Sequence, residues 1–258
     1  MKVLVSLYKW ENPRLCSSES ELSKGDKIVI EGEFGPDIGT VLISGMETAD
    51  NPQQNVLRKA TQRDIEAFKK NNARKNEIVE TARKEAKTIG LEMKIIDARS
   101  TLDGGNMIVA FTANERVDFR ELVKAISKLF HRSVRMQQIG SRDEARKLGG
   151  CGICGRELCC VRFSGNLPSI TTEMARVQQI AHRGSERISG LCGRLMCCLS
   201  FESEQYKELL SGMPELHSFV KVKEGKGEVM EINAIKQEIK IKTEDDKILT
   251  IKKDDLLG

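Results

Sequence analysis

The sequence has few aromatic residues and no long hydrophobic run. Phe, Trp and Tyr make up 4% of its 258 residues, which argues against a broad stacking surface for single-stranded nucleic acid. No stretch of about 18 apolar residues is available to span a bilayer, and no secretory leader precedes the polar residues after Trp10. We therefore expect a cytoplasmic protein without membrane insertion.

Charge of one sign and histidine are also in short supply. There are 42 Lys and Arg against 38 Asp and Glu, and this net charge of +4 gives no strong global attraction to nucleic acid or membrane. The 3 histidines form no Ser-His-Asp arrangement, and the chain has no phosphate-binding loop. We expect a protein that is not an enzyme.

Cysteine is the residue that the sequence does concentrate. Of 8 cysteines, all but Cys16 lie between Cys151 and Cys198, and Cys16 is expected to be incidental in a polar loop. The pattern Cys-Gly-Arg-x-x-Cys-Cys-x-x-Phe occurs twice, at 154–163 and at 192–201. In a reducing compartment such a cluster indicates thiolate ligands rather than disulfides.

The repeated cysteines predict a metal centre. Thiolates bind soft metals, the C-x4-C spacing recurs in iron–sulfur proteins, and the repeated set exceeds the four ligands of one tetrahedral zinc. An iron–sulfur cluster is favoured, zinc is the runner-up, and thiols without metal are a third alternative. The candidate ligands are Cys154, Cys159, Cys160, Cys192, Cys197 and Cys198, with Cys151 as an additional candidate and His182 as a minor one.

Glycines and arginines accompany the cysteines in both copies. Gly155 and Gly193 let the chain turn sharply and expose backbone N–H groups to thiolates or cluster sulfides. Arg156 and Arg194 either add positive charge beside the ligands or pair with carboxylates such as Glu157. We therefore expect these four residues to surround the metal ligands.

The pattern of strands and helices predicts an α+β protein. We expect a small N-terminal β module at 1–55 and a central αββαβ region at 56–148, arranged as an α/β sandwich with helices on one face of a mixed or antiparallel sheet. A cysteine-rich, metal-binding insert at 149–212 and a C-terminal small β barrel at 213–258 complete the chain.

Capping signals predict where the helices of the central region begin. One long helix is expected from Thr61 to Gly90, with the Thr61 hydroxyl as its cap and Asp64 as the reciprocal cap partner. Further helices are expected from Asp118 and from Ser141, the latter with Glu144 as its cap partner. The stretch from 58 to 87 carries ten Lys and Arg against five Asp and Glu. It is either a solvated helix face or a contact for RNA or an acidic protein.

Four segments resemble the PSP-one C-terminal domain proteins, most closely the RicT (YaaT) family. The resemblance covers about residues 22–255 and is carried by 116–122, 138–145, 148–150 and 189–199. It implies a non-catalytic regulator with 4Fe–4S clusters on the six repeated cysteines. It also implies small RicA-like and RicF-like partners and an influence on RNase Y, on mRNA processing and, in sporulating bacteria, on phosphorelay output.

The chain departs from that family at two places. Cys151 stands where an apolar residue is common, and 181–185 replaces a loop that usually carries Asn-Pro. The alternatives to an iron–sulfur regulator are a zinc-stabilised module that binds RNA or protein, and a thiolate-based electron carrier. Direct RNA contact stays an open question at this point.

Overall fold

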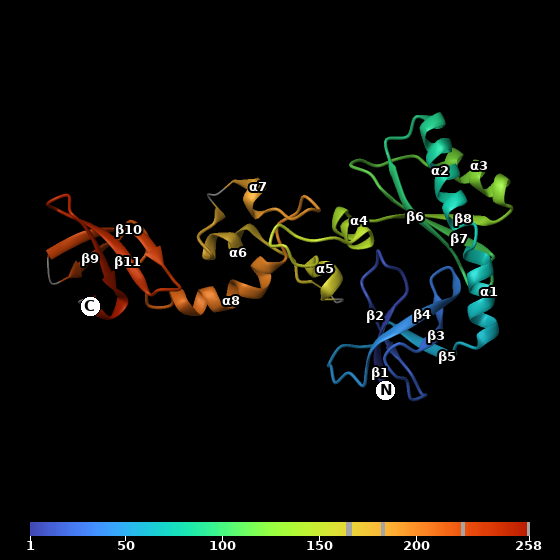
Figure 1. Cartoon of the computed structure of the whole chain (residues 1–258), viewed down its shortest axis with the longest axis horizontal. Coiled ribbons are helices and arrows are strands. Elements are labelled where there is room, and N and C mark those ends of the chain that lie inside the picture. Colours follow the sequence, from blue (N-terminus) through green and yellow to red (C-terminus); the bar gives the residue numbers. More distant parts are fainter. Residues whose placement is uncertain (164–166, 182–183, 223–224, 257–258) are drawn as a thin grey trace. The chain divides into compact units, whose positions relative to one another are not determined.

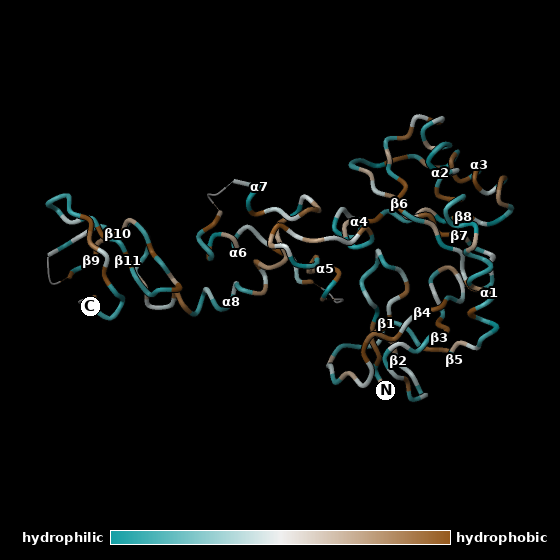
Figure 2. Tube along the Cα trace, in the orientation of Figure 1, coloured by the Kyte–Doolittle hydropathy of each residue, from teal (hydrophilic) through white to brown (hydrophobic). Residues whose placement is uncertain are grey.

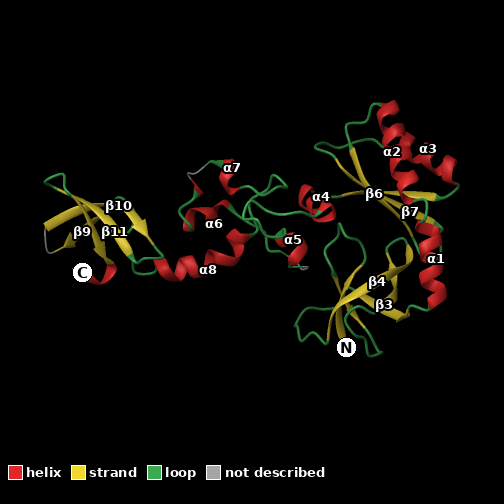
Figure 3. Ribbon diagram, in the orientation of Figure 1, coloured by secondary structure: helices red, strands yellow, loops and turns green. Residues whose placement is uncertain are grey.

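The computed structural model describes residues 1–163, 167–181, 184–222 and 225–256. It is an α+β structure with several sheets, and it divides into two compact units (Figures 1 and 3). The first unit comprises Met1–Leu167 together with Leu191–Arg194, and the second comprises Pro168–Gly190 and Leu195–Gly258. Among the described residues, no helix is both long enough and apolar enough to cross a membrane.

The N-terminal strands close into a barrel in the order β1-β2-β5-β3-β4. Its strands are β1 (Lys2–Ser6), β2 (Arg14–Ser17), β3 (Lys27–Gly32), β4 (Gly35–Ser44) and β5 (Gln54–Lys59). Hydrophobic residues gather on these strands, whereas helix α1 beyond them is mainly hydrophilic (Figure 2). Gly39 is required by close packing, because a Cβ there would lie 2.4 Å from Val5 Cγ1. The expected N-terminal β module is thus a closed barrel.

One prediction for this region was wrong. Cys16 does not lie in a polar loop: it lies in β2, pairs with Val3 and is fully buried in the barrel core. The polar residues that follow Pro52 also belong to the barrel, since Gln54 of β5 pairs with Cys16 in parallel. Backbone pairing outweighed the polarity of both segments.

The predicted long helix is two helices, α1 (Gln62–Asn72) and α2 (Lys75–Ile89). Thr61 and Asp64 cap α1 reciprocally, and Gly90 ends α2 in the left-handed region, as predicted. The break follows Asn72, whose side-chain amide bonds the backbone N–H and C=O of Ser100 at 2.8 and 3.2 Å. These bonds join the end of α1 to strand β6 (Lys94–Ser100).

A three-stranded mixed sheet lies at the centre of the first unit. Its strands are β6 (Lys94–Ser100), β7 (Asn106–Thr112) and β8 (Ser133–Gln138), in the order β6-β7-β8, with β7 and β8 parallel. Helices α2 and α3 (Arg120–Phe130) pack on one face of it around Met107 and Val109. Ile108 and Ala110 point to the other face and join the core of the barrel. The sheet is therefore covered on both faces.

One predicted helix start is displaced by one position, and one predicted cap partner differs. The N-cap of α3 is Phe119, and Asp118 instead accepts the backbone N–H of Arg120 at 3.1 Å. Helix α4 (Ser141–Leu148) begins at Ser141 as predicted, but its cap partner is Asp143 rather than Glu144, since Asp143 accepts the N–H of Gly140 at 3.1 Å. In both cases a carboxylate satisfies a terminal N–H, although not at the predicted position.

The second unit contains helices α6 (Thr172–Val177), α7 (Ser185–Ile188) and α8 (Cys198–Leu210), whose core includes Ala175, Ile188 and Leu199. Its C-terminal part is an antiparallel sheet in the order β12-β11-β10-β9, not the barrel we expected. The strands are β9 (Phe219–Val222), β10 (Gly225–Asn233), β11 (Glu238–Thr243) and β12 (Ile248–Lys252), followed by the single turn η2 (Lys253–Asp255).

Candidate metal centre

Each cysteine motif folds into a short hairpin closed by an isolated β-bridge. In the first copy the bridge joins Cys151 to Glu157, and in the second it joins Ser189 to Leu195, at positions 38 residues later in the chain. Cys151 therefore has Ser189 as its counterpart. This substitution explains why the first copy alone contains a C-x-x-C spacing.

The hydrogen bonds of the two hairpins also correspond. Leu158 donates its backbone N–H to the carbonyl of Gly150 at 3.1 Å, and Met196 donates to Ile188 at 2.9 Å. Both pairs differ by the same offset as the sequence repeat. The duplicated sequence thus encodes a duplicated backbone conformation.

The glycine that follows the first repeated cysteine has the same conformation in both copies. Gly155 has φ +74° and Gly193 has φ +73°, in the left-handed region that side chains with a Cβ avoid. No other atom lies within 4 Å of the position that a Cβ would take at either glycine. Backbone conformation rather than crowding therefore requires glycine here, as the sequence predicted.

The paired cysteines lie where each hairpin runs into a helix. Cys159 and Cys160 open α5 (Cys159–Arg162), and Cys198 opens α8 directly after Cys197. All eight cysteines are described, and each is a thiol rather than half of a disulfide. In the cysteine region only Cys160 is buried; the exposed ones are Cys151 and Cys154, and the half-buried ones are Cys159, Cys192, Cys197 and Cys198.

Within each unit the repeated cysteines are not gathered around one point. In the described ranges, no three side chains of His, Cys, Asp or Glu form a group that could hold a metal ion. The ligand set therefore stays a prediction.

Within the first unit, one cysteine of the first copy, Cys160, interacts electrostatically with one cysteine of the second copy, Cys192. Burial raises the pKa of the Cys160 thiol; Arg146 acts in the opposite direction, and the negative charge of a Cys192 thiolate raises this pKa further. Cys160 and Cys192 are thus within electrostatic range of each other, although 32 positions separate them in the sequence. This electrostatic coupling links two of the predicted ligands from different copies.

Helix α4 presents positive charge to this pair. The Arg146 side chain is 11% exposed, and Nη2 is 3.5 Å from Asp143 Oδ1. Its Nε and Nη1 atoms are buried without an acceptor among the described residues. Buried donors without partners cost about 1–3 kcal/mol each. An anionic thiolate centre beside Cys160 would supply acceptors and compensating charge, so these residues are compatible with the predicted iron–sulfur or zinc site.

Ion pairs with the central sheet hold α4 in place. Lys147 Nζ lies 2.9 Å from Asp97 Oδ2 in β6, and the Asp97 side chain is 4% exposed. Glu144, on the same helix, pairs with Lys94 of β6 and accepts from Thr112 of β7. Sequence reasoning overlooked α4 as part of the site. The detectable signal was two arginines four residues apart, on one helix face, directly before the first cysteine.

The two arginines of the repeats, expected to surround the ligands, are both exposed. Arg156 contributes its carbonyl, which accepts the N–H of Gly152 at 2.8 Å. The Arg194 guanidinium lies over the start of α4, 3.2 Å from the position of a Cβ on Gly140. Equivalent positions in the sequence therefore have different surroundings, and Arg194 is the one that meets α4.

Two further candidates from the sequence are His182 and the basic stretch from 58 to 87. His182 lies outside the described residues. Of the basic stretch from 58 to 87, several members are paired with carboxylates on the same stretch. The pairs are Arg58–Asp64, Arg74–Glu77 and Arg83–Glu80. These pairs reduce the positive charge that the stretch offers to RNA.

Comparison with known proteins identifies the class to which this fold belongs. Residues 54–139 match the PSP1 C-terminal conserved region, and residues 169–213 match the third domain of PSP1-like proteins. Stage 0 sporulation protein YaaT of Bacillus subtilis (strain 168) is 33% identical over 218 residues, which are 83% of this chain and 79% of that protein. No solved structure matches the chain.

The chain is thus a PSP1-type protein, built from a barrel, a mixed sheet and a pair of cysteine hairpins. Within that class it belongs to the YaaT (RicT) family. The resemblance stated from the sequence motifs is confirmed.

Proposed function

We propose that this chain is a regulatory iron–sulfur protein that acts through contacts with other proteins and not through catalysis. The observation that supports the proposal is the electrostatic coupling of Cys160 and Cys192, one from each hairpin, near Arg146, whose Nε and Nη1 are buried without an acceptor among the described residues. A family relative named as a stage 0 sporulation protein supports a role in regulation of sporulation or of a related developmental process.

The proposed ligands are the repeated cysteines. A 4Fe–4S cluster supplies a compact anionic centre that thiolates bind tightly and that positive charge stabilises. Arg146 would donate to it, and Gly155 and Gly193 would direct hairpin N–H groups toward the sulfurs. The proposed ligand set is Cys154, Cys159, Cys160, Cys192, Cys197 and Cys198, with Cys151 as the additional candidate.

Metal binding would order the two hairpins into a surface that partners recognise, because a site that is incomplete without metal gains its structure on binding. The proposed partners are small RicA-like and RicF-like proteins, and the proposed target is RNase Y-dependent mRNA processing and phosphorelay output. These assignments rest on membership of the family.

Anaerobic purification of the full chain tests the proposal. Iron and acid-labile sulfide in equal amounts, with the visible absorption of a 4Fe–4S cluster, are expected. Colourless protein with stoichiometric zinc would favour a zinc-stabilised binding module instead. Reversible reduction coupled to turnover of an electron donor would favour an electron carrier.

A control separates specific from adventitious metal. Cys16 lies buried in the barrel, so Cys16→Ala should keep the iron and sulfide of the parent chain. Cys160→Ser should lose them. Equal iron content in both variants would contradict the assignment of Cys160 as a metal ligand.

A further inference from the structure

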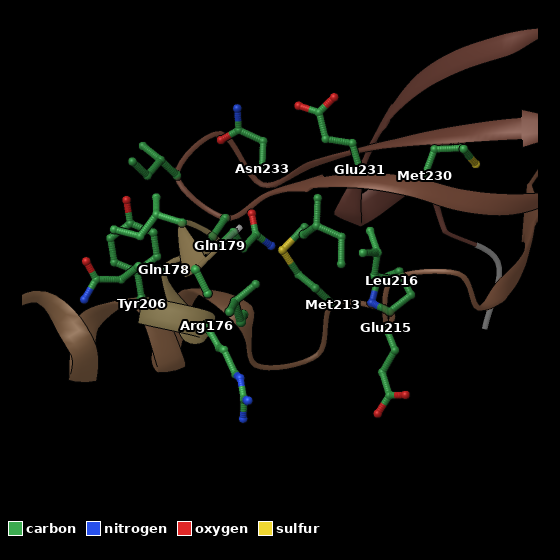
Figure 4. A pocket seen from close by; sticks show the side chains of 17 residues that line it. Arg176, Gln178, Gln179, Tyr206, Met213, Glu215, Leu216, Met230, Glu231 and Asn233 are labelled. Atoms are coloured by element: carbon green, nitrogen blue, oxygen red, sulfur yellow. The ribbon is translucent and has the colours of Figure 1, made fainter. Parts of the chain in front are cut away.

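The second unit contains an open groove of about 1120 Å³ beside the C-terminal sheet. Residues of α6, α8, the loop before β9 and the end of β10 line it (Figure 4). It exceeds the roughly 300–1,000 Å³ of ordinary small-molecule sites. Its apolar lining includes Ile180, Leu210, Met213, Leu216, Met230 and Ile232.

The groove forms where the pairing between strands β9 and β10 ends. Strand β9 pairs with Gly225 to Glu228 of β10, and the backbone of His217 makes a last bond to Val229 at 2.8 Å. His217 has φ +64°, an uncommon left-handed conformation for a residue with a Cβ, which turns the chain away from β10. From Met230 onward, no described strand pairs with β10 on this side.

An unpaired strand edge carries backbone donors and acceptors that another strand can satisfy. Met230 to Asn233 present such an edge to the groove, while their other side is paired with β11. Leu216 and Met230 remain 51% and 44% exposed.

The charges around the groove favour a basic occupant. Arg176 pairs with Glu173 at 3.3 Å, and Glu231 pairs with Lys240 at 2.7 Å. Among the described residues, Glu215 is the lining carboxylate for which no ion pair is found. A phosphate backbone would meet repulsion here, whereas a lysine or arginine would find a partner.

We propose that this groove binds an extended segment of a partner protein by strand addition along Met230 to Asn233. The segment has apolar side chains at alternate positions, which enter the groove, and at least one basic residue near Glu215. Backbone hydrogen bonds supply affinity, and the alternate side chains supply specificity. The inference uses no metal ligand, so it stands or falls separately from the iron–sulfur proposal.

A synthetic peptide provides the probe. Fluorescence anisotropy should show saturable binding of the full chain to a labelled peptide in which valine alternates with lysine over about six residues, a typical strand length. The same peptide N-methylated at alternate residues, which removes the donors of one edge, should not bind. Absence of saturable binding by the first peptide, or equal binding by both, would overturn the proposal.

Matched variants locate the site. Leu216→Asp and Met230→Asp should each weaken binding at least about tenfold, equivalent to about 1.4 kcal/mol. Ile248→Asp, at an exposed position on β12 that does not line the groove, should leave binding unchanged. Thermal unfolding verifies that each variant is folded, and iron content should not differ among them.

Other occupants have distinct outcomes. Dimerisation of the chain that Leu216→Asp abolishes would assign the groove to a second copy and overturn the proposal. Binding of an oligouridylate that the same variant abolishes would also overturn it. Retention of peptide binding in both groove variants would place the peptide elsewhere.

Discussion

Lys147 of α4 and Lys75 of α2 bind the two oxygens of one buried carboxylate, Asp97 of β6, at 2.9 and 2.7 Å. Asp97 Oδ1 also accepts the N–H of Ala98 at 2.9 Å. This carboxylate joins both helices to the sheet. Because α4 also carries Arg146, the pairing sets where positive charge meets the first cysteine hairpin.

Replacement of Asp97 by alanine should destabilise the first unit. The change removes hydrogen bonds to charged groups and leaves two lysines without their carboxylate, at a cost of about 2 kcal/mol. Urea unfolding measures the difference. Asp118→Ala is the control, since the Asp118–Arg120 pair is exposed to solvent and should contribute much less to the free energy of unfolding. Equal midpoints for the Asp97 variant and the parent would contradict the structural role.

Alanine at the left-handed glycines should distort the hairpins. Gly155→Ala and Gly193→Ala each place a Cβ in a conformation that costs about 1–2 kcal/mol. We expect lower iron retention after anaerobic reconstitution, measured per chain. Gly152→Ala is the matched control, because Gly152 is not in the left-handed region and its Cβ would lie 3.5 Å from Cys154 Sγ, an ordinary contact. An equal loss of iron in the Gly152→Ala control would contradict the view that the left-handed conformation of Gly155 and Gly193 is what the metal centre requires.

The barrel should lose stability in alkali through Cys16. Burial raises the pKa of this thiol from 9.0 to about 11, although Arg14 opposes the shift. Between these two values the unfolded chain has released the thiol proton while the folded chain retains it, so stability falls as pH rises. The loss should approach about 2 kcal/mol by pH 11.

The comparison with Cys16→Ala isolates this effect. The variant should unfold with a shallower dependence on pH from about 9 to 11, whatever its stability at neutral pH. Chemical denaturation at several pH values measures both slopes. Parallel slopes for parent and variant would contradict the raised pKa.

The sequence predicted local structure well where one signal governed it. Thr61 with Asp64 identified the start of α1, and Gly90 identified the end of α2. The repeat predicted a glycine turn in both hairpins, and Gly155 and Gly193 adopt it. Each of these features depends on a few neighbouring residues, which the sequence displays directly.

Features that depend on distant pairing were not predictable. Cys16 lies among polar neighbours, and only its pairing with Val3 makes it a core residue. Asn72 at the end of α1 bonds Ser100 of a distant strand, and closure of the barrel requires β5 to reach β2. The place of Arg146 beside Cys160 depends on the docking of α4 through Asp97. Sequence spacing carries no record of these contacts.

Loss of positive charge beside the cysteines should change the metal centre. Arg146→Gln removes a guanidinium whose Nε and Nη1 lack acceptors in the described structure. We expect a lower reduction potential and faster loss of iron to a chelator, because positive charge stabilises an anionic cluster. Arg146→Lys should restore part of both properties. The exposed Arg156→Gln should change neither, and an equal shift in that control would assign the effect to net charge alone.

The most direct measurement is the iron and sulfide content of three variants prepared anaerobically: Cys160→Ser, Cys192→Ser and the double variant. If the two hairpins hold one shared cluster, either single substitution removes as much iron as the double substitution does. Additive losses, or iron that survives in the double variant, would contradict a centre shared between Cys160 and Cys192.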